Sequence, residues 1–395
     1  MRISTQQFNS RSIAGILDQQ SALSTTQSQV ATGKKVSTPA DDPIATVQIA
    51  QLQRAQSELD QFGKNSDLAR TRLTLEEQAL SDAGTVLDRI RELTVQASNT
   101  GGLTATDQQS IANEIAQREQ ELLDIANRKD GNGEYLFSGL STTTQPFVRA
   151  SGGGVSYAGS PVNRLVQIGQ SQRVADSDPG FDVFVTIPEG NGTFATSASA
   201  ANTGAGVISA GSVINKAAWI PDNYTLTFTS ATTWQVTDSA SNTIATGNYT
   251  DGGAIAFNGV QVAVTGAPAS GDTFSIAQAG KQDIFATLDN LVSALRQPSG
   301  SGQLSTALGG ALQQIDQANT QFTSVRTQVG ARLSTLDDAD ASRQDQSVQY
   351  QSAVSTLQDI DLATAITKLN QQAVGLQAAQ QAYTKIAQLS LFNYL

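Results

Sequence analysis

Apolar residues recur every seven positions along the chain from Pro43 to about Asn99. They form two columns three or four residues apart, a spacing that places side chains on one narrow face of a helix. No proline interrupts the stretch after its first residue, and a single helix of this length would extend roughly 80 Å at 1.5 Å per residue. The pattern predicts a rod with a seam of two columns: Ala45, Leu52, Leu59, Ser66, Leu73, Leu80 and Leu87, beside Ala55, Phe62, Ala69, Ala83, Ile90 and Ala97.

A second helix is predicted after the glycine pair Gly101 and Gly102. Thr104 or Thr106 is its expected N-cap, because a threonine hydroxyl accepts a hydrogen bond from the free N–H groups of the first turn. The apolar residues that then share one face are Ile111, Ile115, Leu122 and Ile125. We expect the helix to end near "KDGNGEYLFSG" (129–139), in which "EYLFSG" is typical of a short strand.

A third helical tract is predicted from about Gln303 to the end of the chain, preceded by a shorter apolar stretch at 283–295. The chain thus has two long helical stretches before the middle region and two after it. We expect the stretches before and after the middle region to pack antiparallel. The apolar columns of the third tract are Leu308, Ile315, Phe322, Val329, Leu336, Tyr350 and Leu357, with Leu312, Leu333 and Val354 beside them.

The middle of the chain has a different pattern. Residues 151–280 hold 18 of the 33 glycines and both tryptophans. Apolar and polar residues alternate at 181–188, 224–230 and 255–266, and turn residues separate these stretches, which is typical of β-strands. The fold class predicted is mainly α with a β-rich insert, a long antiparallel helical rod bundle built from both chain ends. The expected boundaries are 1–42 and 353–395 for the terminal segments, 43–150 and 281–352 for the rod, and 151–280 for the insert.

Both chain ends carry more apolar residues than one helix pair can cover. Heptad spacing predicts that the two ends pair as a coiled coil, either alone or buried by other chains. We favour burial by other chains, because Leu17, Val374, Leu391 and Phe392 lie off the apolar stripe. The candidate assembly residues are Ile13, Ile16, Leu23, Val30, Leu362, Ile366, Leu369, Leu376, Tyr383, Leu389, Leu391, Phe392 and Leu395.

Composition removes several classes of function. The chain has 24 Lys and Arg against 35 Asp and Glu, a net charge of −11, so nucleic acid is not an expected partner. It has no cysteine and no histidine, which removes disulfides, thiolate and imidazole catalysis and the usual Cys/His metal sites. We therefore expect no catalytic residues, no cofactor and no metal, and interpret the protein as structural.

Neither a secretory signal nor a membrane span is expected. The first residues, "MRISTQQFNS", have no apolar core of the kind a cleaved signal requires. No apolar run approaches the ~18 residues of a membrane helix. The protein is expected to be cytoplasmic or exported by a route that reads no such signal.

The acidic pair Asp41 and Asp42 lies between Pro39 and Pro43. A metal or acid–base site would need both carboxylates on one face and a third ligand nearby, and adjacent helical residues do not share a face. The alternative is a helix start, with Asp41 or Asp42 as the cap and Pro43 at the first helical position. We favour the helix start.

Several short motifs resemble the flagellin superfamily, and within it the proteins of the junction between hook and filament. They are "MRIST" at the start, "QSQVATGKKVSTPADDPIA" (27–45), "GEYLFSG" (133–139), "TQPF" (144–147) and "LQAAQQAYTKIAQLSLFNYL" (376–395). The resemblance covers about 1–150 and 281–395. The order and placement of the motifs make the combination specific.

The resemblance implies a fold and a set of partners. The terminal segments would pair as a coiled coil in an inner tube, the longer helices would form an outer rod bundle, and the insert would project outward. The subunit would be secreted unfolded through the flagellar type III export channel and located at the hook–filament junction. The implied partners are copies of itself in a ring, the preceding hook-associated junction protein, flagellin, and an export chaperone that binds the C-terminal segment.

Two other functions stay open. The chain could be a flagellin-type filament subunit, although "MRIST" and "SLFNYL" differ from common flagellin termini. The insert could instead carry an enzymatic or adhesive site, which would have to use its scattered acids: Asp182, Glu189, Asp222, Asp238, Asp251 and Asp272. The structural adaptor is the leading hypothesis.

Overall fold

The computed structural model describes residues 5–99, 104–150, 153–297 and 301–392. It divides into a terminal unit, Met1–Lys64 with Ala339–Leu395, and a middle unit, Asn65–Asp338. The sequence distributes charge unequally between them. The terminal unit has nine basic and nine acidic residues, whereas the middle unit has 15 basic and 26 acidic residues and so carries the whole net charge of −11.

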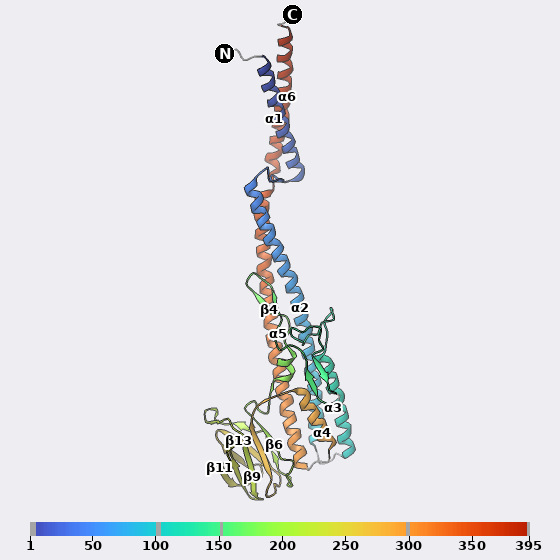
Figure 1. Cartoon of the computed structure of the whole chain (residues 1–395), viewed down its shortest axis with the longest axis vertical. Helices are drawn as coiled ribbons and strands as arrows, with labels where there is room; N and C mark the ends of the chain where they lie inside the picture. Colours follow the sequence, from blue (N-terminus) through green and yellow to red (C-terminus); the bar gives the residue numbers. More distant parts are fainter. Residues whose placement is uncertain (1–4, 100–103, 151–152, 298–300, 393–395) are drawn as a thin grey trace. The chain divides into compact units, whose positions relative to one another are not determined.

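The terminal unit is made of four helical segments. Helix α1 (Thr5–Thr32) lies beside helix α6 (Leu362–Phe392) (Figure 1). The first turns of α2 (Pro43–Ser98) pack against the last turns of α5 (Ser301–Gln358). A small apolar cluster joins these two helices to the loop after α1 and consists of Val36, Ala45, Ile49, Val354 and Leu357.

The C-terminal tract is two helices, and the expectation of one continuous helix from about Gln303 was wrong. Helix α5 ends at Gln358 and α6 begins at Leu362. Asp361 caps the new helix, since its Oδ1 accepts the backbone N–H of Ala363 at 3.0 Å. The helical hydrogen bonds continue as far as the N–H of Asp359, which donates to the carbonyl of Ser355 at 2.8 Å. The next N–H, that of Ile360, donates instead to the carbonyl of Gly33 in the loop after α1, and the helix ends there.

The middle unit contains the rest of α2 and α5 together with α3 (Ala105–Ala126) and α4 (Ile284–Arg296), which lie side by side (Figure 1). Thr104 is the N-cap of α3 and forms a capping box with Asp107. The predicted columns of α2 and α5 in this unit are buried except for Leu312 and Leu333, which are half-buried, and this pattern confirms the helical part of the fold class. The buried members are Ser66, Ala69, Leu73, Leu80, Ala83, Leu87, Ile90, Ala97, Leu308, Ile315, Phe322, Val329 and Leu336.

The middle unit also contains two short hairpins and one pair of strands that are far apart in the sequence. Strand β1 (Phe147–Arg149) pairs with β2 (Val155–Tyr157), and β3 (Leu165–Gln167) pairs with β4 (Arg173–Ala175). Strand β5 (Ile187–Pro188) pairs with β15 (Lys281–Gln282). An aromatic core of rings from five segments lies between hairpins and helices: Phe137, Phe147, Phe184, Phe285 and Phe322.

Two local predictions were wrong in this region. Residues 134–139 form turns with one isolated bridge, Lys129 to Tyr135, instead of a strand, whereas α3 ends at Ala126, close to the predicted stop. Residues 181–185 form a π-helix instead of a strand. The reason is the same in both places: neighbouring residues such as Val183 and Phe184 are both fully buried, whereas successive residues of a strand point to opposite faces.

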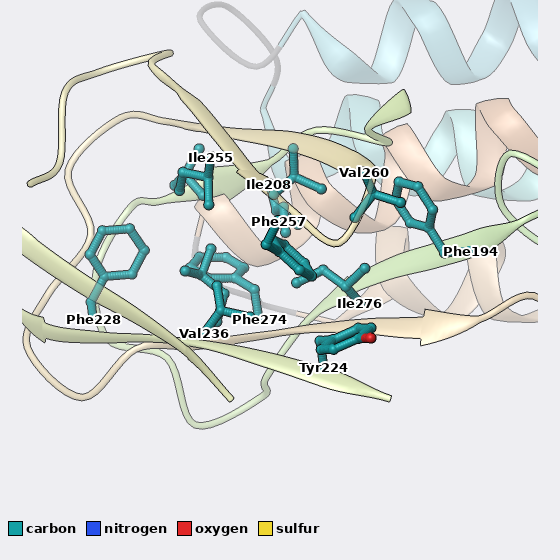
Figure 2. Close-up of a cluster of buried hydrophobic side chains, with 13 residues drawn as sticks. Phe194, Ile208, Tyr224, Phe228, Val236, Ile255, Phe257, Val260, Phe274 and Ile276 are labelled. Carbon is teal, nitrogen blue, oxygen red and sulfur yellow. The ribbon is translucent and has the colours of Figure 1, made fainter. Parts of the chain in front are cut away.

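The insert is a β-sandwich at residues 194–278. Its larger sheet has the order β11-β10-β9-β14-β6 and its smaller sheet the order β12-β13-β7, with β8 also paired to β13. Figure 2 shows the apolar side chains that fill the space between the two sheets, among them Phe228, Phe257 and Phe274. The strands are β6 (Phe194–Ala198), β7 (Val207–Ile208), β8 (Ser212–Val213), β9 (Tyr224–Ser230), β10 (Thr233–Thr237), β11 (Thr243–Asn248), β12 (Ala254–Phe257), β13 (Val260–Thr265) and β14 (Thr273–Gln278).

Two of the predicted strand regions match this sandwich closely. Strand β9 has the predicted bounds 224–230. The stretch 255–266 is the β12–β13 hairpin, whose turn is Asn258-Gly259 with φ of 42° and 79°. Asn-Gly is the pair that a type I′ hairpin turn favours, since both central residues need positive φ. The predicted β-rich insert is confirmed.

Candidate assembly surface

The candidate assembly residues of α1 and α6 lie along a helix pair that buries few side chains. Ile16, Leu23 and Val30 of α1 are half-buried, as are Leu369, Leu376 and Tyr383 of α6. Three others are exposed: Ile13, Leu362 and Ile366. The side chains of Leu389, Leu391 and Phe392, and all of Leu395, lie outside the described residues.

The pair leaves its apolar residues partly open to solvent. Among the described side chains of α1 and α6, those classed as buried are Thr26 and Ala365. Leu17 is 58% exposed and Val374 is 66% exposed. Exposure of this much apolar surface on two long helices is typical of a contact site.

A groove lined in part by small residues lies between α1 and α6. It has a volume of about 250 Å³. Ser12 and Gly15 of α1 lie opposite Ala379 and Ala382 of α6, and Ile16, Gln19, Tyr383 and Ile386 complete the lining. A Cβ built at Gly15 would meet no other atom within 4 Å, so the groove has room for an apolar side chain from elsewhere.

The loop between α1 and α2 forms hydrogen bonds with the segment between α5 and α6. The N–H of Lys35 donates to the carbonyl of Gln358 at 2.7 Å, and the N–H of Ile360 donates to the carbonyl of Gly33 at 3.0 Å. Lys35 also places its Nζ 2.9 Å from the carbonyl oxygen of Thr356. The sequence offered no sign of this pairing beyond Gly33, which has the positive φ of a helix C-cap.

The acidic pair lies at the start of α2. Asp42 Oδ1 accepts the backbone N–H groups of Ile44 at 3.0 Å and Ala45 at 2.9 Å, and Pro43 is the first helical residue. Asp41 Oδ2 accepts the N–H groups of Thr38 and Ser37, and these hydrogen bonds hold the pKa of Asp41 below its usual value. Both carboxylates thus hold backbone at the helix start. In the described part of the chain, no group of three or more acidic side chains is arranged to hold a metal ion.

Sequence reasoning missed a buried cluster of charged residues in the middle unit. Arg72 of α2 is 1% exposed and donates to Asp130 and, at 3.1 Å, to Glu134. Arg164 donates to Glu134 at 3.0 Å and to Asp176 at 2.5 Å. Asp130 and Glu134 lie 58 and 62 residues after Arg72 in the sequence, so no local spacing could have indicated these contacts. Together they fasten the 130–134 turn and the β3–β4 hairpin to α2.

No helix in the described part of the chain is long and apolar enough to cross a membrane.

Comparison with protein families matches three stretches of the chain. The bacterial flagellin N-terminal helical region matches residues 3–142, and the bacterial flagellin C-terminal helical region matches residues 312–395. The D2-like domain of flagellar hook-associated protein 1 matches residues 197–278, which include nearly the whole sandwich. The motif-based resemblance to the flagellin superfamily is confirmed.

Three relatives narrow the assignment. Flagellar hook-associated protein 3 of Salmonella typhimurium is 34% identical over 187 residues, which span 47% of this chain and 58% of that protein. The crystal structure of Xanthomonas campestris FlgL has a TM-score of 0.72 at 34% identity, covering 77% of this chain and 99% of that one. The flagellar junction protein FlgL from Legionella pneumophila has a TM-score of 0.71 at 34% identity, covering 79% and 100%. The chain therefore belongs to the FlgL family of flagellar hook-associated proteins, within the flagellin superfamily.

Proposed function

We propose that the protein is a structural adaptor at the hook–filament junction of the bacterial flagellum. It joins the preceding hook-associated protein on one side to flagellin on the other. The observation that carries the proposal is a helix pair, α1 with α6, that exposes apolar residues in a chain whose relatives are named hook-associated protein 3 and flagellar junction protein. The protein would act through its shape alone. One end of a ring of subunits fits the hook side, and the other end is the surface on which the filament starts.

The terminal unit suits contact between copies of the chain. Its net charge is zero, so identical units do not repel one another as two acidic middle units would. Leu17 and Val374 lie exposed on the same helix pair that carries the groove over Gly15 and Ala379. Side chains of one copy can fill the groove of the next, a head-to-tail contact of the kind that closes into a ring.

Export of the chain is coupled to its folding at the junction. The subunit leaves the cell unfolded through the flagellar type III channel, with a chaperone on its C-terminal segment, and is located outside the cell at the junction. The terminal helices complete their burial when neighbours cover them, which couples folding to assembly. No catalytic step, cofactor or metal takes part.

Deletion of the gene tests the position of the protein. Without a junction adaptor, cells are expected to keep hooks, lose filaments and release flagellin monomers into the medium. Immunogold electron microscopy of wild-type flagella with antibodies to the 194–278 sandwich is expected to label one band between hook and filament. Label along the whole filament, or a deletion strain without released flagellin, would contradict the adaptor and support a filament subunit.

The filament subunit is the second candidate, because the flagellin N- and C-terminal helical regions both match this chain. Purified protein distinguishes the two. A flagellin is expected to polymerise into long filaments when seeded with filament fragments. The adaptor is expected to add to hook ends that carry the preceding hook-associated protein and to stop after a short ring.

Limited proteolysis tests the coupling of folding to assembly. In the free monomer, we expect proteases to remove residues ~1–40 and ~355–395 first, because uncovered terminal segments open most readily. The middle unit, with its buried seam and aromatic core, is the expected resistant fragment. Mass spectrometry of the fragments checks this, and full resistance of both ends in the monomer would argue against assembly-coupled folding.

A further inference from the structure

Glu76 is buried in the middle of α2 without a cationic partner of its own. Its side chain is 0% exposed. Oε1 accepts the backbone N–H of Asp178 at 2.9 Å, whereas Oε2 is buried and makes no hydrogen bond. A carboxylate in such a place would leave a full charge unsatisfied, which costs far more than burying a neutral acid.

The charged groups around Glu76 do not supply the missing partner. Arg332 of α5 is a cation whose charge acts on Glu76, but its two Nη atoms both donate to Asp178, each at 2.8 Å. Asp176, which has a buried oxygen without a partner, is committed to Arg164 and lies close to Arg72. Acidic groups thus face Glu76 from the 176–178 segment, and the guanidinium groups of α5 and α2 are already engaged.

We propose that Glu76 is a proton-operated latch that holds the 176–178 segment against α2 and α5. With a proton, Glu76 is a neutral acid that accepts from Asp178 N–H and can donate its own O–H toward the neighbouring carboxylates. Without the proton, it is a third buried anion beside Asp176 and Asp178, and repulsion pushes the segment away from the helices.

The direction of the pH effect follows from burial. Burial, followed by the charge of Asp178, raises the pKa of Glu76 well above its usual value in the folded chain. A raised pKa in the folded state means that this contribution to stability is complete below the unfolded pKa. It is lost as the pH rises through the folded pKa. The latch therefore loosens toward alkaline pH.

The segment that the latch holds leads directly into the aromatic core. Asp178 is followed by Pro179 and Gly180, and then by the π-helix Phe181–Val185, which carries Phe184. A Cβ at Gly180 would lie 2.5 Å from the Phe147 ring, so this backbone sits tightly against the core. The nearby Asp182 adds to the acidic side, and burial together with Asp178 raises its pKa as well.

Hydrogen exchange on the full-length chain tests the latch between about pH 4 and pH 9. After correction for the intrinsic exchange rate, backbone protection in a peptide covering 176–185 is expected to be constant below the ordinary pKa of a glutamic acid. Between that pKa and the raised pKa of Glu76 in the folded chain, protection should fall about tenfold per pH unit, because opening of the segment releases one proton, and above the folded pKa it should level off. Glu76→Gln retains an acceptor and adds a permanent donor, so the fall due to Glu76 is expected to disappear in this variant, which should keep only the pH dependence of neighbours such as Asp182.

A matched control and a direct measurement complete the test. Glu77→Gln changes the next residue, which lies at the surface and pairs with Arg326 at 2.6 Å, and should keep the wild-type pH dependence. The infrared difference spectrum of wild type minus Glu76→Gln at neutral pH should contain the band of one protonated carboxylic acid. Absence of that band, or the same pH dependence in wild type and Glu76→Gln, would overturn the latch, even if the variant were poorly folded in the exchange experiment.

Discussion

Arg72→Met is expected to lower the free energy of unfolding of the middle unit by about 3–5 kcal/mol, the range found when one partner of a buried ion pair is removed. Arg72 is 1% exposed and lies between the carboxylates of Asp130, Glu134 and Asp176. Methionine fills similar volume without charge, so the loss comes from leaving buried carboxylates unpaired. Urea unfolding followed by circular dichroism measures the change.

Arg89→Met is the matched control for this prediction. Arg89 also belongs to α2 and pairs with Glu92 at 2.9 Å and Glu114 at 2.8 Å, but its side chain is 45% exposed. Exposed pairs are screened by solvent and contribute little to stability, so the loss in Arg89→Met should be much smaller than in Arg72→Met. Equal losses in the two variants would mean that the buried cluster does not fasten the 130–134 turn and the β3–β4 hairpin to α2.

Phe184→Ala is the second change with a large expected effect, a loss of about 3–5 kcal/mol in the free energy of unfolding. The Phe184 ring is fully buried and lies 5.2 Å from Phe137, 5.3 Å from Phe322 and 5.4 Å from Phe147, between ring centroids. Its removal would leave a cavity where the π-helix, the β1–β2 hairpin and α5 meet. The same urea experiment measures the loss.

Phe181→Ala provides the comparison for Phe184→Ala, because Phe181 begins the same π-helix but is 37% exposed. We expect its effect to be below about 1.5 kcal/mol, since an exposed ring leaves no cavity. If truncation of Phe184 were as mild as that of Phe181, the aromatic cluster would not be a core that holds these segments together.

The helices were predictable because their signal is local. Leu73, Leu80 and Leu87 could be placed on one face from their spacing, and all three are fully buried. The Asn258-Gly259 turn was not predicted, although its signal is equally local, because few residue pairs adopt two positive φ angles. In each case the interacting residues lie within a few positions of one another.

The π-helix and the break before α6 were not predictable in the same way. The alternation of Phe181, Val183, Val185 and Ile187 is typical of a strand. The structure instead buries Val183 and Phe184 together against rings from four other segments. Likewise, nothing near Asp359 in the sequence indicates that its backbone pairs with Lys34. Tertiary contacts overrode the local pattern in both places.

For the candidate assembly residues, too, the helix face could be predicted from the sequence but the contacts between helices could not. Heptad spacing placed Ile16, Leu23 and Leu376 on apolar faces of α1 and α6, and the helices place these side chains half-buried between them. Spacing alone could not tell that Gly15 and Ala379 would line a groove. That depends on which face of α1 meets which face of α6.

The sequence by itself determined the helical arms, the β-rich insert, and the absence of cysteine and histidine chemistry, because periodicity and composition are properties of neighbouring residues. Only the tertiary structure decided which charges meet. Arg72 reaches Asp130 across 58 positions, Glu76 reaches Asp178 across 102, and Arg332 reaches Asp178 across 154. Side chains so far apart along the chain become neighbours only when burial of the α2 and α5 seams brings their segments together.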